Sequence, residues 1–109
     1  MSWKLFLDDE RFPTDLYNDP FEWRIARGYQ DAKWMVETYG MPSFISFDHD
    51  LGSNTWSGMD FCKWLCHFMT ANEIDPTTFE FYVHSMNPVG AENIRSYLNN
   101  FVRVHKEYS

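Results

Sequence analysis

The sequence contains no long run of apolar residues. Its apolar stretches span a few residues and are interrupted by Asp, Lys or His, whereas a bilayer crossing needs about 20 apolar residues in succession. The amino terminus reaches Lys4 and Asp8 without the apolar stretch of a secretory signal. We therefore expect a cytoplasmic protein that does not associate with a membrane.

Runs of basic residues are absent too. The chain has 9 Lys and Arg against 16 Asp and Glu, which gives a formal net charge of −7 at pH 7. This charge argues against a broad surface for nucleic acid or anionic lipid. It is compatible with a nucleotide ligand, because a few arginines and a divalent cation can neutralise a phosphate inside a pocket.

Cysteine is scarce. Cys62 and Cys66 are four residues apart in a segment with helical periodicity. A zinc site would need two further ligands, and His67 points to another side of that helix. Free cysteines in a reducing compartment pack as small hydrophobic residues, so we interpret both as core residues.

Hydrophobic and aromatic residues are abundant, at 44% and 19% of the 109 residues. This composition predicts a folded chain, and the length suits one core, so we expect residues 1–109 to form a single domain. Short apolar runs alternate with segments of helical periodicity. That pattern favours an α/β fold in which helices cover a parallel sheet.

Five strands and three helices are predicted. The strands are residues 3–7, 22–27, 44–47, 79–83 and 101–104; the helices are residues 31–39, residues 58–72 and a segment beginning at Pro88. Residues 10–20 contain two prolines and are predicted to form a loop that can hold one helical turn.

Titratable and polar residues follow the strands at their carboxyl ends, which is where ligands bind in open α/β sheets. The residues at these ends are Asp8, Asp9, Arg27, Asp48, His49, Asp50, His84, Ser85 and Asn87. We expect them to meet along one rim of the sheet.

The aspartates Asp8, Asp9, Asp48 and Asp50 are candidate metal ligands. Carboxylates brought together repel one another, and a bound cation removes that conflict. Oxygen ligands suit Mg²⁺ or Mn²⁺. The alternative is that the first pair ends a strand and caps a turn, while the second pair shapes a loop.

His49 and His84 are candidates for proton transfer, because imidazole titrates near neutral pH. Hydrogen-bonded histidines at a sheet edge are the competing interpretation. Arg27 is a candidate clamp for a phosphate, or else an ion-pair partner of Asp8 or Asp9.

The segment from Ser85 to Gly90 is predicted to open a helix. Backbone N–H groups at such a helix start bind anions, which makes Ser85, Asn87 and Gly90 candidate phosphate contacts. An ordinary helix cap by Ser85 or Asn87 is the simpler alternative. Trp56 lies in the Gly-flanked loop after Asp48 and Asp50. It is a candidate for stacking on a base or for closing over a ligand, and the alternative is that it packs on its own domain.

Several motifs together resemble a known family. They are Leu7 to Arg11 with Pro13, then Ala26-Arg27, then Ile45 to Gly52 with Gly58, and finally Val83 to Gly90. This pattern is similar to the cyclic-phosphate processing receiver domain and extends from Leu7 to about Ile94.

The resemblance implies a receiver or flavodoxin-like three-layer fold with about five parallel strands in the order 2-1-3-4-5. It implies that Asp8 and Asp9 hold a metal ion, that Asp48 stands where receivers accept a phosphoryl group, and that Ser85 is the small hydroxyl residue after the fourth strand. The resemblance further implies that His49 and His84 are features of this family that ordinary receiver domains lack.

Two departures from ordinary receivers stand out. The first helix is replaced by the loop at residues 12–20, and the lysine after the fifth strand has no secure match, with Lys106 as a candidate. The last helix is also expected to be reduced or absent. An open flank of the sheet would result, and self-association as a homodimer through that flank is a hypothesis.

These inferences lead to three functional hypotheses. The preferred one is a metal-assisted phosphoesterase that acts on a cyclic phosphate of a nucleotide or an RNA end, with Asp48, His49 and His84 as its catalytic residues. The alternatives are a receiver-like phosphoacceptor and a protein that binds a cyclic nucleotide or a partner without turnover.

Overall fold

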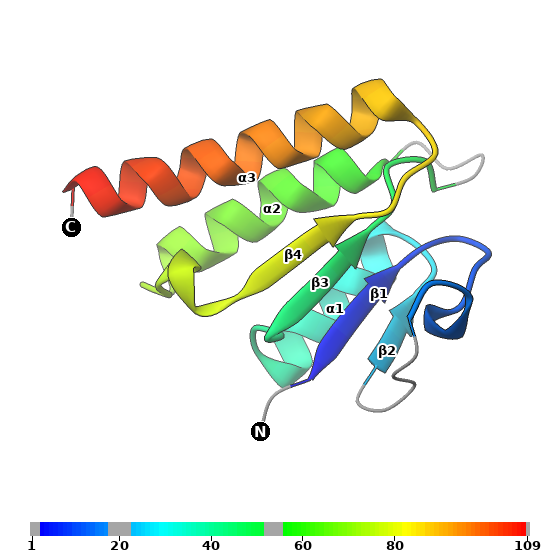
Figure 1. Ribbon diagram of the computed structural model, residues 1–109. Coiled ribbons are helices and arrows are strands. Elements are labelled where there is room, and N and C mark those ends of the chain that lie inside the picture. The colour runs from blue at the N-terminus through cyan, green and yellow to red at the C-terminus, as the bar shows by residue number, and fades with distance from the viewer. Residues whose placement is uncertain (1–2, 18–22, 52–55, 109) are drawn as a thin grey trace.

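The computed structural model describes residues 3–17, 23–51 and 56–108. Its four strands form one parallel sheet in the order β2-β1-β3-β4 (Figure 1). The strands are β1 (Lys4–Leu7), β2 (Trp23–Ala26), β3 (Phe44–Phe47) and β4 (Glu80–Val83). The helices are α1 (Tyr29–Tyr39), α2 (Gly58–Ala71) and α3 (Pro88–Tyr108), and the short 3-10 turns are η1 (Pro13–Asp15) and η2 (Pro76–Thr78). The predicted receiver-like α/β fold is therefore confirmed, with four strands rather than five.

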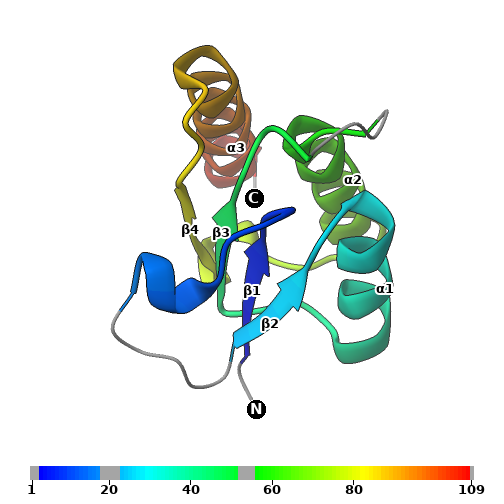
Figure 2. The same cartoon turned by 90° about the vertical axis from the view of Figure 1, so that its right-hand side faces the viewer.

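The main core lies between the sheet and its helices. Leu5 and Leu7 of β1 and Ile45 and Phe47 of β3 are fully buried in one cluster with the inner residues of all three helices. Figure 2 shows α1 and α2 on one side of the sheet and η1 on the other, and α3 packs beside α2. Successive side chains of a strand point to opposite faces, so the residues between those of the main core face the other side of the sheet.

The second face carries a small aromatic layer. Phe6 and Phe44 each contact Trp23 edge to face, and Tyr17 packs over Trp23 and Phe44 from the segment after η1. In the described residues no helix covers this face, in agreement with the predicted replacement of the first helix. The covering is a single 3-10 turn with its flanking residues.

The predicted strand at residues 101–104 is wrong, because this segment lies inside α3. Two valines in four residues favoured a strand. However, the apolar stripe that begins with Ala91, Ile94 and Leu98 reaches Phe101 at helical spacing, and the three earlier residues are buried in the main core. Tertiary packing along this stripe therefore extends the helix through the segment.

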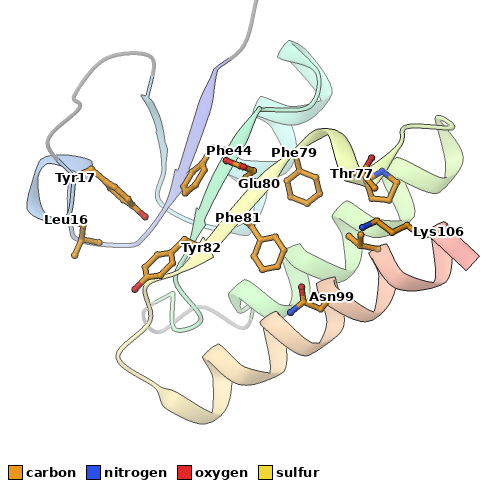
Figure 3. A pocket seen from close by; sticks show the side chains of 12 residues that line it. Leu16, Tyr17, Phe44, Thr77, Phe79, Glu80, Phe81, Tyr82, Asn99 and Lys106 are labelled. Atoms are coloured by element: carbon orange, nitrogen blue, oxygen red, sulfur yellow. The ribbon is translucent and has the colours of Figure 1, made fainter.

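The edge of β4 that faces away from β3 is not paired with any described strand. A groove of about 820 Å³ follows this edge, between the η1 segment and α3. Figure 3 shows Phe81 on the α3 side of the groove and Tyr17 and Tyr82 toward η1, with Lys106 beside Thr77. The expected open flank was attributed to a reduced or absent last helix, whereas the structure has the 21-residue helix α3 beside this groove. Self-association through it stays a prediction.

Both cysteines are buried in α2, which confirms them as core residues. A hydrogen bond with Cys66, together with burial, raises the pKa of the Cys62 thiol far above its ordinary value. None of the helices in the described ranges is both long enough and apolar enough to cross a membrane.

Candidate functional site

Three neighbouring strands deliver a polar residue to the same rim of the sheet. Leu7, Phe47 and Val83 are aligned in register across β1, β3 and β4, and each is followed by a titratable residue. The following residues are Asp8, Asp48 and His84, which are all buried, and each offers a ligand atom within 4.8 Å of the others. The structure thus brings together side chains that are far apart in the sequence.

Asp8 accepts four hydrogen bonds. Its Oδ1 accepts the backbone N–H groups of Glu10 at 2.8 Å and Arg11 at 2.9 Å. Its Oδ2 accepts Arg11 Nε at 2.8 Å and lies 3.0 Å from His84 Nε2. Burial alone would raise the pKa of Asp8, but these backbone and side-chain hydrogen bonds together lower it below the ordinary value. Asp8 is therefore a stable anion at neutral pH.

Asp48 is buried to a similar depth but has the opposite pKa shift. Burial, and then the negative charge of Asp8, raise its pKa, and Arg11, the Ser85 hydroxyl and the Asp50 N–H only partly oppose them. The positive charge nearest to its carboxylate in the described structure is Arg11, whose guanidinium lies 3.8 Å from Asp48 Oδ2. A cation bound beside Asp48 would relieve this conflict.

Arg11 bridges the two carboxylates. In addition to its contacts with Asp8 and Asp48, it donates to the carbonyl of His84 at 3.4 Å. Sequence reasoning placed Arg11 in the family motif and last among the candidate phosphate contacts, and it did not predict the bridge. The available signal was its spacing: an arginine three residues after an aspartate that ends a strand can fold back on that aspartate through a tight turn.

His84 lies beneath the site rather than at its surface. Its side chain is 1% exposed, and its ring stacks in parallel on Phe6 with ring centres 4.8 Å apart. Nε2 contacts Asp8, and Nδ1 lies 2.6 Å from the hydroxyl of Ser46, which is in turn 2.9 Å from that of Tyr17. Both ring nitrogens are thus engaged inside the protein. Sequence reasoning missed Ser46 and Tyr17, although a serine within an apolar strand is a usable signal.

His49 and Asp50 form the more exposed part of the site. His49 Nδ1 lies 3.0 Å from Asp50 Oδ1, and this hydrogen bond lowers the pKa of Asp50, outweighing burial, which raises it. The His49 ring packs directly on Gly90, where a Cβ would overlap the ring. The first turn of α3 therefore fixes the position of His49.

Gly58 is required for a similar reason, because a Cβ there would overlap the carbonyl oxygen of Asp48. Its N–H donates to the carbonyl of His49 at 2.8 Å. The start of α2 is fixed by a capping box in which Ser57 and Asp60 bond to each other's backbone N–H groups. The two helix starts thus hold the residues that follow β3.

The remaining candidates have mainly local contacts. Arg27 donates to the backbone carbonyls of Asp8 at 3.2 Å and Arg11 at 2.6 Å, so it holds the turn after β1. Trp56 is 43% exposed and stacks on Tyr29 with ring centres 4.7 Å apart.

At the start of α3, Asn87 Oδ1 accepts the N–H of Gly90 at 3.0 Å, and Ser85 Oγ accepts the N–H of Asn87 at 3.1 Å. These are the contacts of a helix cap. Lys106 lies near the end of α3 and lines the groove beside β4, away from the acidic rim.

A shallow acidic cavity of about 380 Å³ opens at the rim. Its lining residues are Asp8, Asp9, Glu10, Arg11, Asp48, Asp50 and Met86. Carboxylate oxygens are ligands that suit Mg²⁺ or Mn²⁺, and the raised pKa of Asp48 is the electrostatic condition that a cation would correct. The residues present therefore fit a hard divalent cation, which would compete with Arg11 for the buried carboxylates.

Comparison with known families agrees with this arrangement. Residues 3–100 match the family described as the cyclic-phosphate processing receiver domain, a range that includes all four strands and the residues at their carboxyl ends. The searches of curated proteins and of solved structures gave no match. On the family match, which covers most of the sequence, the chain belongs to the cyclic-phosphate processing receiver domain family.

Proposed function

We propose that this protein is a metal-assisted phosphoesterase that hydrolyses a cyclic phosphate on a nucleotide or an RNA end. The observation that carries the proposal is the buried Asp48 beside Asp8, with its raised pKa, in a cavity lined by further carboxylates. Its membership of the cyclic-phosphate processing family supports the choice of a cyclic phosphate as the substrate. The acidic surface of the chain suits a small phosphate ligand better than a long nucleic acid.

Asp8 and Asp48 would hold the cation, with Asp9 and Asp50 at the rim of the cavity. When bound, Mg²⁺ or Mn²⁺ supplies positive charge that polarises the phosphoryl oxygens. Arg11 adds a guanidinium that can pair with the phosphate. The charge that develops on the phosphate in the transition state is thereby stabilised.

His49 is the candidate for proton transfer. Its hydrogen bond with Asp50 fixes one ring nitrogen, and its side chain is 21% exposed, against 1% for His84. Water would add to phosphorus while one ring P–O bond breaks, and His49 would accept the proton of the water or return one to the leaving oxygen. The buried His84 acts in this mechanism by holding Asp8.

The test uses 2′,3′-cyclic nucleotides with Mg²⁺ or Mn²⁺. We expect Asp48→Asn and His49→Gln to lower turnover at least 100-fold, in line with the usual contribution of a proton-transfer group. His67→Gln is the matched control, because His67 is exposed on α2. Equal turnover in all these variants, or no turnover in the parent protein, would rule out the mechanism.

A receiver-like phosphoacceptor is the second candidate, because Asp48 is a buried carboxylate directly after β3. Treatment with acetyl phosphate would then add one phosphoryl group, and Asp48→Asn would abolish that mass increase. Tight retention of a cyclic nucleotide without product or phosphorylation would instead indicate a binding protein.

A further inference from the structure

A chain of hydrogen bonds runs from the acidic rim along the aromatic face of the sheet. It consists of Asp8 Oδ2, His84 Nε2 at 3.0 Å, His84 Nδ1 to Ser46 Oγ at 2.6 Å, and Ser46 Oγ to the Tyr17 hydroxyl at 2.9 Å. Ser46 is 0% exposed within β3, between the apolar Ile45 and Phe47. A hydroxyl buried at such a position is costly unless it is hydrogen-bonded, and these two contacts satisfy it.

The chemistry of the partners fixes the direction of the chain. The Asp8 carboxylate only accepts hydrogen bonds, so Nε2 of His84 carries the proton that faces it. In a neutral ring Nδ1 is then an acceptor, and Ser46 donates to it. The oxygen of Ser46 in turn accepts from Tyr17. The hydrogen bonds are therefore donated in one direction, from Tyr17 to Ser46, from Ser46 to His84 and from His84 to Asp8.

The electrostatic environment supports this order. The His84 side chain is 1% exposed and stacks on Phe6, and a charged imidazolium at such a position is costlier to bury than a neutral ring. Burial likewise raises the pKa of Tyr17, so its hydroxyl keeps its proton. A neutral imidazole and a protonated phenol are the two states that the order requires.

The ring of His84 also has a fixed plane. It lies parallel to Phe6, at an angle of 3°, and Phe6 is held in turn by an edge contact with Trp23. Stacking restricts tilting of the imidazole, while the contacts at its two nitrogens restrict rotation in its plane. Asp8 therefore receives a hydrogen bond of defined direction.

We propose that Ser46 and Tyr17 are positioning residues, which hold His84 in the Nε2–H tautomer and thereby fix the Asp8 carboxylate between His84 and Arg11. This inference concerns the residues beneath the site, and its catalytic consequence rests on the proposed function. Loss of the Ser46 hydroxyl removes the donor to Nδ1, so that Asp8 alone favours the Nε2–H tautomer and the Nδ1–H tautomer becomes partly populated. The lone pair of Nε2 would then face a carboxylate, and Asp8 would move relative to Arg11.

Tyr17 extends the effect to the groove beside β4. It is one of the residues that line this groove, and Figure 3 shows its ring reaching over the sheet with the hydroxyl directed inward. Tyr82 lines the same groove, is 57% exposed and has no place in the chain of hydrogen bonds. Tyr82 is therefore a matched control for Tyr17.

The experiment measures the ¹⁵N chemical shifts of the imidazole nitrogens, with His84→Gln used to assign the His84 signals. We expect the parent protein to show the Nε2–H tautomer of His84 alone. Ser46→Ala should give a mixture of tautomers, Tyr17→Phe a smaller change, and Ser46→Thr the parent signals. Tyr82→Phe and Ser43→Ala, which removes a hydroxyl bonded to the carbonyl of Trp3, should leave them unchanged.

The second readout is binding of Mn²⁺ alone, for which we expect Ser46→Ala to weaken affinity about 10-fold, as removal of groups that orient ligands commonly does. An Nδ1–H tautomer in the parent protein, or unchanged His84 signals in a folded Ser46→Ala variant, would overturn the proposal. Neither result depends on turnover. Failure of the proposed function would instead be seen as a parent protein with the expected tautomer and no phosphoesterase activity.

Discussion

The two halves of the acidic rim differ, although they are built alike. Asp8 and Asp48 each follow a buried strand, and the two strands are paired neighbours. Asp8 is surrounded by four hydrogen-bond donors and has a lowered pKa, whereas the pKa of Asp48 is raised by burial and by Asp8 itself. The two carboxyl groups are both buried, yet their pKa values shift in opposite directions. The hydrogen-bond donors around Asp8 stabilise its negative charge, and those around Asp48 do not outweigh its burial.

The difference originates in the segments that follow the strands. After β1 the chain turns at once, and the N–H groups of Glu10 and Arg11 point back at Asp8. After β3, Gly58 holds the described residues, because its N–H donates to the carbonyl of His49 and its Cα lies close against the carbonyl of Asp48. We interpret the Asp8 half as the frame of the site and the Asp48 half as the part available to a ligand.

The largest effect is expected for Asp8→Asn. An amide has one acceptor oxygen in place of two, so it cannot accept all four hydrogen bonds of Asp8, and we expect the free energy of unfolding to fall by about 3 kcal/mol. Urea denaturation at neutral pH measures it. Asp75→Asn is a matched control, because Asp75 caps a turn at the surface. If Asp8→Asn lowers the free energy of unfolding by less than Asp75→Asn does, Asp8 is not part of the frame of the site.

Arg11→Met should have the next largest effect. It removes the guanidinium that bridges Asp8 and Asp48, and we expect a loss of about 2 kcal/mol in the absence of divalent ions. Because Arg11 competes with a cation for these carboxylates, Mn²⁺ should bind the variant more tightly and restore part of the stability. Thermal unfolding with and without Mn²⁺ measures both. Weaker Mn²⁺ binding in the variant would contradict this competition.

For Asp48→Asn we expect the opposite sign, a gain of about 1 kcal/mol in the metal-free protein at neutral pH, as is common when strain at a functional site is removed. The pKa of Asp48 is raised above its ordinary value of 3.8, so the folded parent loses stability as pH rises from 3.8 through the raised value. The advantage of the variant should therefore be absent in acid and grow toward neutrality.

Asp8 gives the reverse dependence on pH. Its pKa in the folded state is lowered, so its contribution is present above 3.8 and is lost as pH falls through the lower value. Denaturation curves of the Asp8→Asn and Asp48→Asn variants between pH 3 and pH 7 would compare the two halves directly. Parallel curves for both variants would show that the halves do not differ.

The smallest effect is expected for Trp56→Leu. Trp56 belongs to the segment between β3 and α2 and stacks on Tyr29, an interaction worth about 1 kcal/mol. Tyr29→Leu is the matched variant, since it removes the same contact from the other side. If both raise KM for a cyclic nucleotide equally, the stack has a supporting role. A larger rise for Trp56→Leu alone would favour the prediction that Trp56 contacts the ligand.

The sequence predicted the rim well because strand ends are local signals. The runs before Asp8, Asp48 and His84 are apolar and short, and parallel pairing then brings their ends together. It did not predict the end of the chain, because Val102 and Val104 suit a strand and only the packing of Ile94 and Leu98 decides for a helix.

The contacts of individual side chains were less predictable. Ser46 has the sequence context of an ordinary strand residue. Only the structure shows the hydrogen bond between its hydroxyl and that of Tyr17, which is 29 positions away. Arg27 was considered a partner of a phosphate or a carboxylate, and its guanidinium instead bonds to backbone carbonyls, which have no signature in a sequence. Such contacts depend on the path of the chain through space.

The pair of thiols in α2 offers a probe of folding. Cys62 is buried, and its raised pKa leaves almost no thiolate to react while the chain is folded. Alkylation in native buffer should therefore proceed only when α2 leaves the sheet, and its rate would report how often this happens. The same reagent, applied with and without Mn²⁺, would show whether occupancy of the rim slows opening of a helix on the covered face.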